Sequence, residues 1–173
     1  MKQLCTFALF FPLLLAIHGP LKAQEVGLPI GTVAEPVIVE TLDGEEVNLD
    51  AYLGHQPVLM QFWATWCELC KALEPRMAAA HELYGDQVKF FAVAVGVNQS
   101  PRSIRRHLER NPTPYDFLWD ARGRAVRAYM APTTSYLVLF DASGAVTYTG
   151  VGADQEFEPS LAKVVEERRR AGR

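Results

Sequence analysis

The sequence predicts a single α/β domain with a mixed central sheet flanked by helices. Apolar runs typical of buried strands alternate along the chain with segments of helical period, and the series ends in a hairpin followed by a helix. The chain has 173 residues, of which 49% are hydrophobic and 21% charged. These values fit one domain behind a targeting segment, and they exclude a disordered or fibrous protein.

Residues 1–23 have the pattern of a secretory signal peptide. Lys2 gives a charged start, residues 4–17 form an almost purely apolar run, and Ala23 is a small residue suited to cleavage. The run is shorter than the roughly 20 residues that a helix needs to cross a bilayer, so we expect cleavage near Ala23 and export to the periplasm. Residues 24–36 are then expected to be a mobile segment, and residues 37–173 the folded domain.

A hairpin and a buried strand open the domain. Residues 37–39 and 46–49 flank the turn signal Asp43-Gly44, a pattern typical of a β-hairpin. Residues 57–63 follow as a continuous apolar run, as expected of a strand that is covered on both faces. The hairpin is thus predicted as an N-terminal extension of the sheet.

Two helices and a second buried strand follow. Between residues 68 and 83 apolar side chains recur at helical spacing until Gly85 ends the helix, and Pro75 should kink it. Residues 88–97 form the next apolar run, which predicts a second buried strand. Residues 103–110 are expected to form a charged helix.

The last part of the chain ends in a second hairpin and a helix. A short segment at 117–119 leads to a helix expected near 123–129. Residues 136–140 and 145–149 are apolar runs separated by a turn, and a final helix starts near Pro159. Together these elements predict the mixed sheet.

The motif Cys67-Glu68-Leu69-Cys70 lies where the first buried strand ends and the long helix begins, which is the position expected of a redox pair. At the helix N-terminus, Cys67 meets unpaired N–H groups and the positive end of the helix dipole, and both favour its thiolate. Cys70 is about one turn further on the same side, within reach of the first sulfur. We therefore expect Cys67 to attack a partner disulfide and Cys70 to resolve the mixed disulfide, without a cofactor.

Other interpretations of the cysteine pair stay open. The pair would suit half of a zinc site or a static disulfide, but His55, His81 and His107 are not spaced as ligands and are expected at the surface. Two soft thiolates would also hold Cu(I), which makes a copper-handling protein the main alternative function. A binding module with a vestigial pair is a third reading.

The charge balance excludes one class of partner. The chain has 17 basic and 20 acidic side chains, for a net charge of -3. Such a surface binds nucleic acid poorly. We therefore expect no nucleic-acid partner, and the cysteine pair indicates partners that carry protein thiols or disulfides.

The residues around the cysteine pair resemble the thioredoxin superfamily. The resemblance is carried by Phe62-Trp63-Ala64-Thr65-Trp66-Cys67-Glu68-Leu69-Cys70-Lys71, followed by Pro75. With the leader and the N-terminal hairpin, the chain is similar to exported TlpA/ResA-like thiol-disulfide oxidoreductases. This resemblance implies a thioredoxin fold over about residues 30–168, with Trp66 at the contact surface. It also implies a periplasmic reductase of protein partners, such as apocytochrome c, that receives its electrons from a membrane donor.

The sequence differs from the proteins that it resembles at two positions where they carry a carboxylate. Gln61 stands where cytoplasmic thioredoxins carry a buried Asp, and Leu73 stands where several relatives carry a Glu. Glu74 is one residue out of register, and helical geometry turns it about 100° away from the Leu73 direction. The route of protons to the resolving thiol therefore differs from that of the family.

The resemblance also implies a cis-proline loop that packs against the cysteine pair and contacts the partner. Pro132 matches the local motif Ala131-Pro132-Thr133-Thr134, whereas counting back from the end of the strand at Phe140 places Ser135 in that position. We expect Pro132 to hold it, because a cis peptide before a residue other than proline costs several kcal/mol.

Overall fold

The computed structural model describes residues 26–173, so the signal peptide and its cleavage site lie outside the described residues. Every element expected after residue 36 is found, and the segment at 117–119 is itself a strand. The strands are β1 (Ile38–Thr41), β2 (Glu46–Asn48), β3 (Val58–Trp63), β4 (Lys89–Val95), β5 (Asp116–Asp120), β6 (Leu137–Phe140) and β7 (Val146–Gly150). The helices are the short 3-10 turn η1 (Leu49–Ala51), α1 (Glu68–Tyr84), α2 (Pro101–Arg110), α3 (Arg124–Ala128) and α4 (Glu158–Ala171).

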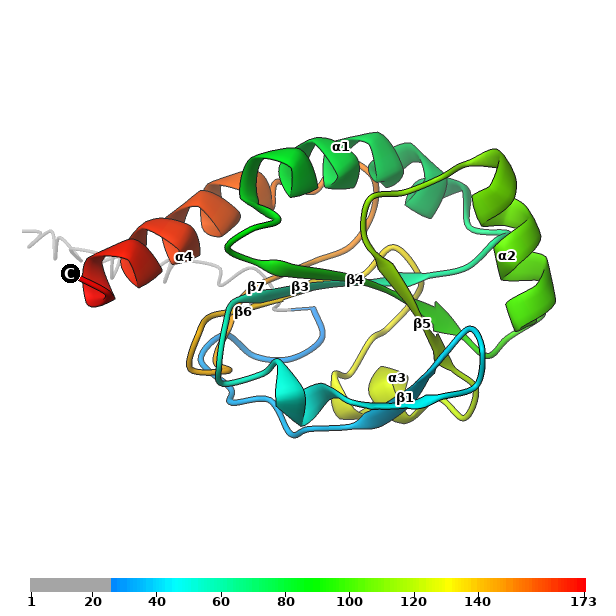
Figure 1. Cartoon of the computed structure of the whole chain (residues 1–173), viewed down its shortest axis with the longest axis horizontal. Coiled ribbons are helices and arrows are strands. Elements are labelled where there is room, and N and C mark those ends of the chain that lie inside the picture. The colour runs from blue at the N-terminus through cyan, green and yellow to red at the C-terminus, as the bar shows by residue number, and fades with distance from the viewer. Residues whose placement is uncertain (1–25) are drawn as a thin grey trace, which may run out of the picture.

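The sheet is mixed, and its central strands are parallel. Its strands follow the order β2-β1-β5-β4-β3-β6-β7. β3 pairs with β4 in parallel and with β6 antiparallel, while the hairpin β1–β2 joins through an antiparallel pair between β1 and β5. Figure 1 shows α1, α2 and α4 on one side of the sheet and α3 on the other. The predicted fold class, with its hairpin extension, is confirmed.

Aromatic side chains anchor the end of β3 from both faces. All six residues of this strand are buried, and alternate side chains point to opposite faces. Phe62 packs against Tyr129 and Tyr136, whereas Trp63 on the other face packs edge-on against Phe117. Burying an aromatic ring removes about 150–250 Å² from water, or about 4–6 kcal/mol before entropy is counted. The strand end that carries the cysteine motif is therefore rigidly held.

The described residues before β1 pack against the start of β7 and against Tyr136. The Gly31 N–H donates to the Val146 carbonyl at 2.8 Å, and the Val146 N–H donates back to the Thr32 carbonyl at 2.9 Å. Leu28 is buried, and its N–H donates to the Tyr136 hydroxyl at 3.1 Å. Residues 28–34, which were expected to belong to a mobile segment, thus make defined contacts with the folded domain, and the extent of that segment stays a prediction.

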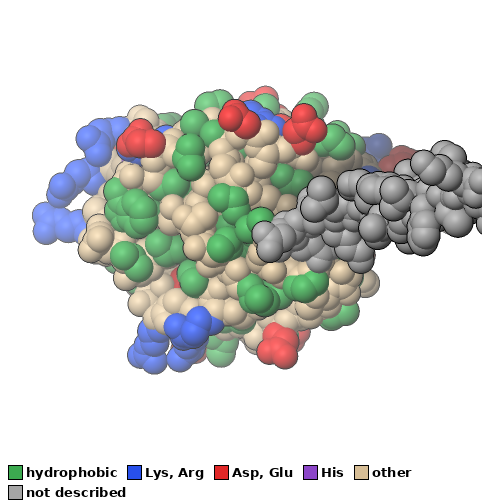
Figure 2. Space-filling model, turned by 180° about the vertical axis from the view of Figure 1, so that it is seen from behind, with side chains coloured by type: hydrophobic (Ala, Val, Ile, Leu, Met, Phe, Trp, Pro, Cys, Tyr) green, Lys and Arg blue, Asp and Glu red, His purple; other side chains and the backbone are tan. Residues whose placement is uncertain are grey.

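Charged side chains are unevenly spread over the surface. In the space-filling view of Figure 2, hydrophobic and neutral side chains occupy the middle of the face seen from behind, and Lys, Arg, Asp and Glu side chains lie towards its margins. The large apolar side chains exposed in the described part of the chain are Val26, Ile30, Val33, Ile38, Trp66, Leu69, Leu83, Val97 and Met130. Trp66 and Leu69 belong to the segment that carries the cysteine motif.

Candidate redox site

Cys67 and Cys70 are joined by a disulfide at the junction of β3 and α1, with their sulfur atoms 2.13 Å apart. Cys67 is the N-cap residue of α1, and the Cys70 N–H donates to the Cys67 sulfur at 3.1 Å. An N–H donor and the positive end of the helix dipole both stabilise negative charge on that sulfur. When the disulfide is reduced, this environment favours a thiolate at Cys67.

The two cysteines differ in access. Cys67 is 6% exposed and Cys70 is fully buried. The Cys70 sulfur lies 3.7 Å from the Phe62 carbonyl oxygen, which offers an acceptor to the thiol of the reduced form. Cys67 is therefore the more accessible cysteine of the pair.

Gln99 and Trp66 tie the turn before Cys67 to the loop after β4. The Thr65 N–H donates to Gln99 Oε1 at 2.9 Å, and Gln99 Nε2 donates to the Val95 carbonyl at 2.7 Å. The Trp66 indole N–H donates to the Val97 carbonyl at 2.9 Å, which holds its ring at the surface with 47% exposed. Sequence reasoning found Trp66 but missed Gln99, whose partner lies far away along the chain.

Ser135 occupies the position beside the disulfide that was expected for Pro132. The described residues include no cis peptide bond, so Pro132 is not a cis-proline here, and its side chain is exposed before the end of the loop. Ser135 is fully buried with a left-handed φ of 65°, and its N–H donates at 2.8 Å to the Phe62 carbonyl that also faces Cys70. The expectation of Pro132 is corrected, because Pro132 lies three positions before Ser135, and four residues separate it from the start of β6.

Gln155 fixes the Ser135 loop from the segment after β7. Its Nε2 donates to the Ser135 carbonyl at 2.8 Å and to the Gly152 carbonyl at 2.6 Å. Arg76 on α1 holds the same segment through the carbonyls of Ala153 and Gln155 and through the Glu158 carboxylate. These bonds connect the helix that carries the cysteines to the loop that flanks them.

The two positions where similar proteins carry a carboxylate hold uncharged side chains here, as the sequence indicates. Gln61 and Leu73 are both fully buried, and neither polar atom of the Gln61 amide has a hydrogen-bond partner in the described structure. Glu74 turns towards α2. Its Oε1 accepts a hydrogen bond of 2.9 Å from the indole N–H of Trp63, at the end of β3. His107 faces Glu74 and is only 8% exposed, so the expected surface position of His107 is wrong.

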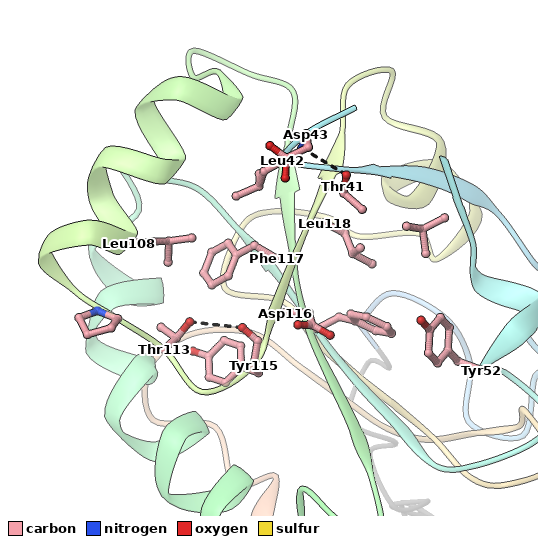
Figure 3. Close-up of a pocket in the computed structure, with 13 residues that line it drawn as sticks. Thr41, Leu42, Asp43, Tyr52, Leu108, Thr113, Tyr115, Asp116, Phe117 and Leu118 are labelled. Atoms are coloured by element: carbon pink, nitrogen blue, oxygen red, sulfur yellow. Dashed lines mark hydrogen bonds between the residues drawn. The ribbon is translucent and has the colours of Figure 1, made fainter. Parts of the chain in front are cut away.

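A cavity of about 560 Å³ lies apart from the disulfide, between the hairpin, β5 and the end of α2. Figure 3 shows Tyr52, Phe117 and Leu118 along this cavity, and neither cysteine lines it. Within residues 26–173, no three His, Cys, Asp or Glu side chains group as metal ligands. In the same residues, no helix is both long and apolar enough to span a membrane.

Solved structures share the fold. A putative thiol:disulfide interchange protein DsbE from Chlorobium tepidum matches with a TM-score of 0.71 and 24% identity, over 80% of this chain and 99% of that one. StoA from Bacillus subtilis matches with a TM-score of 0.61 and 20% identity, over 78% and 96%. At these identities the matches establish the thioredoxin-like fold.

Relatives that are similar in sequence indicate the family and the activity. Thiol-disulfide oxidoreductase ResA from Geobacillus kaustophilus is 26% identical over 86% of this chain and 85% of its own length. Sporulation thiol-disulfide oxidoreductase A from Bacillus subtilis is 22% identical over 87% and 90%. The model of the AhpC/TSA family matches residues 30–149, which is more than half of the chain. With a Cys67–Cys70 disulfide at the position where the fold carries its redox pair, the chain belongs to the AhpC/TSA family, as a TlpA/ResA-like thiol-disulfide oxidoreductase of the thioredoxin superfamily.

Proposed function

We propose that the protein is an exported reductase of protein disulfides in the periplasm, with Cys67 as the nucleophile and Cys70 as the resolving thiol. The observation that carries these roles is the asymmetry of the pair. Cys67 caps α1 and is the more accessible cysteine, while Cys70 is fully buried one turn along the helix. The direction of electron flow follows the resemblance to exported reductases.

The exchange proceeds in two displacements. The Cys67 thiolate attacks one sulfur of the partner disulfide, which forms a mixed disulfide and releases the other partner sulfur as a thiolate. Cys70 then loses its proton and attacks the Cys67 sulfur, which restores the Cys67–Cys70 disulfide and frees the second partner thiol. Two electrons pass to the partner, and a membrane electron donor would return the pair to the dithiol.

An apolar surface beside Cys67 supports contact with a protein partner. Trp66, Leu69 and Val97 are each about half exposed around the end of β3 and the start of α1. Exposed apolar side chains next to a reactive group favour docking of a polypeptide. Pro132 is exposed in the loop before Ser135 and stays a proposed contact for a partner such as apocytochrome c.

Adduct trapping tests the assigned roles. In Cys70→Ala the nucleophile lacks its resolving thiol, so a mixed disulfide with a partner should persist and appear as a new band on a non-reducing gel. In Cys67→Ala the remaining thiol is buried and should trap little. Both variants should be expressed in the native compartment, with the double variant as the control. Trapping by Cys67→Ala alone would reverse the roles, and adducts from neither variant would contradict an exchange mechanism.

A further inference from the structure

Ser135 lies at the end of β3 in a backbone conformation that is costly for its residue type. Its φ is 65°, in the left-handed region that residues other than glycine rarely adopt, and the residue is fully buried. A residue stays in such a conformation only where the surrounding structure holds it there. The loop therefore depends on the hydrogen bonds that Ser135 makes.

Each polar group of Ser135 is hydrogen-bonded. Its N–H donates to the Phe62 carbonyl at 2.8 Å, its Oγ accepts the Gly152 N–H at 3.2 Å, and its carbonyl accepts Gln155 Nε2 at 2.8 Å. The last two bonds come from the segment that follows β7. That segment therefore holds the Ser135 N–H on the Phe62 carbonyl at the end of β3.

Gln155 is fixed in place as the donor to this loop. It is only 9% exposed, and its Oε1 accepts the Tyr148 hydroxyl at 3.3 Å, which turns its Nε2 towards the Ser135 carbonyl. A Cβ at Gly150 would lie 2.6 Å from Gln155 Oε1, so β7 carries a glycine where the amide passes closely. Arg76 on α1 also donates to the Gln155 carbonyl at 2.7 Å. The amide is therefore held from both β7 and α1.

The Phe62 carbonyl is shared between the Ser135 N–H and the resolving cysteine. The Cys70 sulfur lies 3.7 Å from the same carbonyl oxygen. In the disulfide form this sulfur carries no hydrogen, so the Ser135 N–H is the donor that satisfies the carbonyl. In the dithiol form the Cys70 thiol can donate to that oxygen as well, because a carbonyl oxygen has two lone pairs. Loss of the Ser135 N–H therefore costs the disulfide form more than the dithiol form.

We propose that Gln155 is a positioning residue for the redox pair, which holds the Ser135 N–H on the Phe62 carbonyl and thereby stabilises the disulfide form relative to the dithiol. This inference rests on the proposed function, in which the dithiol passes two electrons to a partner disulfide. Cys67 and Cys70 become a disulfide as the partner is reduced to two thiols. A contact that favours the disulfide form therefore makes the dithiol a stronger reductant.

Equilibration with redox buffers measures the balance between the two forms. The purified protein is incubated with graded ratios of the reduced and oxidised forms of glutathione or dithiothreitol, and its free thiols are counted by alkylation and mass spectrometry. The variants are Gln155→Leu, which removes the donor at a similar size, and Tyr148→Phe, which removes the bond that orients the amide. Gln87→Leu is the matched control, because the Gln87 amide bonds to Arg169 from the loop after α1.

We expect Gln155→Leu to lower the equilibrium constant for disulfide formation by at least about fivefold, which makes the reduction potential less negative by about 20 mV. Tyr148→Phe should shift the constant in the same direction by about twofold, and Gln87→Leu should match the wild type. Urea titrations of both redox forms give a second readout. Gln155→Leu should destabilise the disulfide form more than the dithiol form, because folding and disulfide formation belong to one thermodynamic cycle.

An equilibrium constant that is unchanged in Gln155→Leu overturns the proposal. Equal losses of stability in the two redox forms also overturn it, because they indicate a purely structural role. If Gln155→Leu does not fold, Tyr148→Phe decides the matter, and an unchanged constant in that variant overturns the proposal. If the wild-type pair stays in one form at every buffer ratio, it is the exchange mechanism of the proposed function that fails.

Discussion

At the scale of single residues, the disulfide is framed by side-chain amides. Gln99 holds the turn before Cys67 and Gln155 holds the Ser135 loop, while Gln61 lies buried in β3 on the strand that leads to the pair. An amide accepts and donates hydrogen bonds without changing its charge between pH 5 and 8. These amide contacts with the loops around the sulfurs therefore stay the same throughout that range.

Cys67 should be the more reactive thiol of the reduced protein. In Cys70→Ser we expect alkylation by iodoacetamide at pH 7 to be about tenfold faster than in Cys67→Ser, because Cys67 is more accessible and gains the helix N-terminus. Alkylation rates measured by mass spectrometry check this. The same two variants in denaturant serve as the control and should react equally. A native Cys70→Ser no faster than free glutathione would contradict the nucleophile assignment.

Local signals predicted the cysteine pair and Trp66, but they did not predict the residues that hold them in place. Gln99 acts on a backbone N–H that is 34 positions away, and such a contact leaves no local pattern in the sequence. His107 lies in a charged stretch that suggests a solvated helix face. Ile104 three positions earlier is the signal that would have found it, because the two share one face of α2 and both are buried. The cost of a non-proline cis bond favours Pro132 over Ser135 in the sequence. The described residues contain no cis bond, so this cost does not arise in the loop.

At the scale of elements, sequence patterns predicted the helices and strands after residue 36 except β5, which was expected only as a short segment at 117–119. These patterns are strong because β3, β4 and β6 are buried on both faces and α1 turns one apolar stripe to the sheet. Residues 28–34 lack such a period. They are held instead by single backbone hydrogen bonds to β7 and by the buried side chain of Leu28, which a periodicity search does not detect.

Gly27 should be required for the packing of this N-terminal segment. A Cβ at Gly27 would lie 2.2 Å from the Tyr136 hydroxyl oxygen, and its φ of 83° already disfavours other residues. We expect Gly27→Ala to lower the free energy of unfolding by about 1–3 kcal/mol, measured by urea titration. Gly31→Ala is the matched control, because its φ is 85° and nothing lies within 4 Å of its Cβ. Equal losses in the two variants would show that contact with Tyr136 carries no weight.

At the scale of the whole molecule, buried tyrosines should set the upper pH limit of the fold. Burial raises the pKa of Tyr129 and Tyr115, and burial followed by the Glu158 charge raises the pKa of Tyr148 to about 12. The unfolded chain loses these protons near pH 10, so above that value it binds fewer protons than the folded state. Stability is then complete below pH 10 and falls as the pH rises towards the folded values.

We expect the free energy of unfolding to fall above pH 10 by about 1.4 kcal/mol per pH unit for each tyrosine that stays protonated in the folded state. Urea titrations between about pH 8 and pH 11, a range that spans the ordinary tyrosine pKa of about 10, check this. Tyr129 is fully buried. Tyr129→Phe should therefore reduce the slope of the free energy of unfolding against pH by the contribution of one tyrosine. A stability that stays constant or rises above pH 10 would contradict the prediction.

One edge of the sheet is very short and the other is partly covered. At one edge β2 has only three residues, and at the other residues 31–34 pair with residues 144–146, at the start of β7. A long unpaired edge invites another chain to add a strand, which leads to aggregation. Such edges favour encounters through side chains or loops over encounters by sheet extension. We therefore expect the folded protein to resist the addition of strands from unfolded polypeptides that it meets.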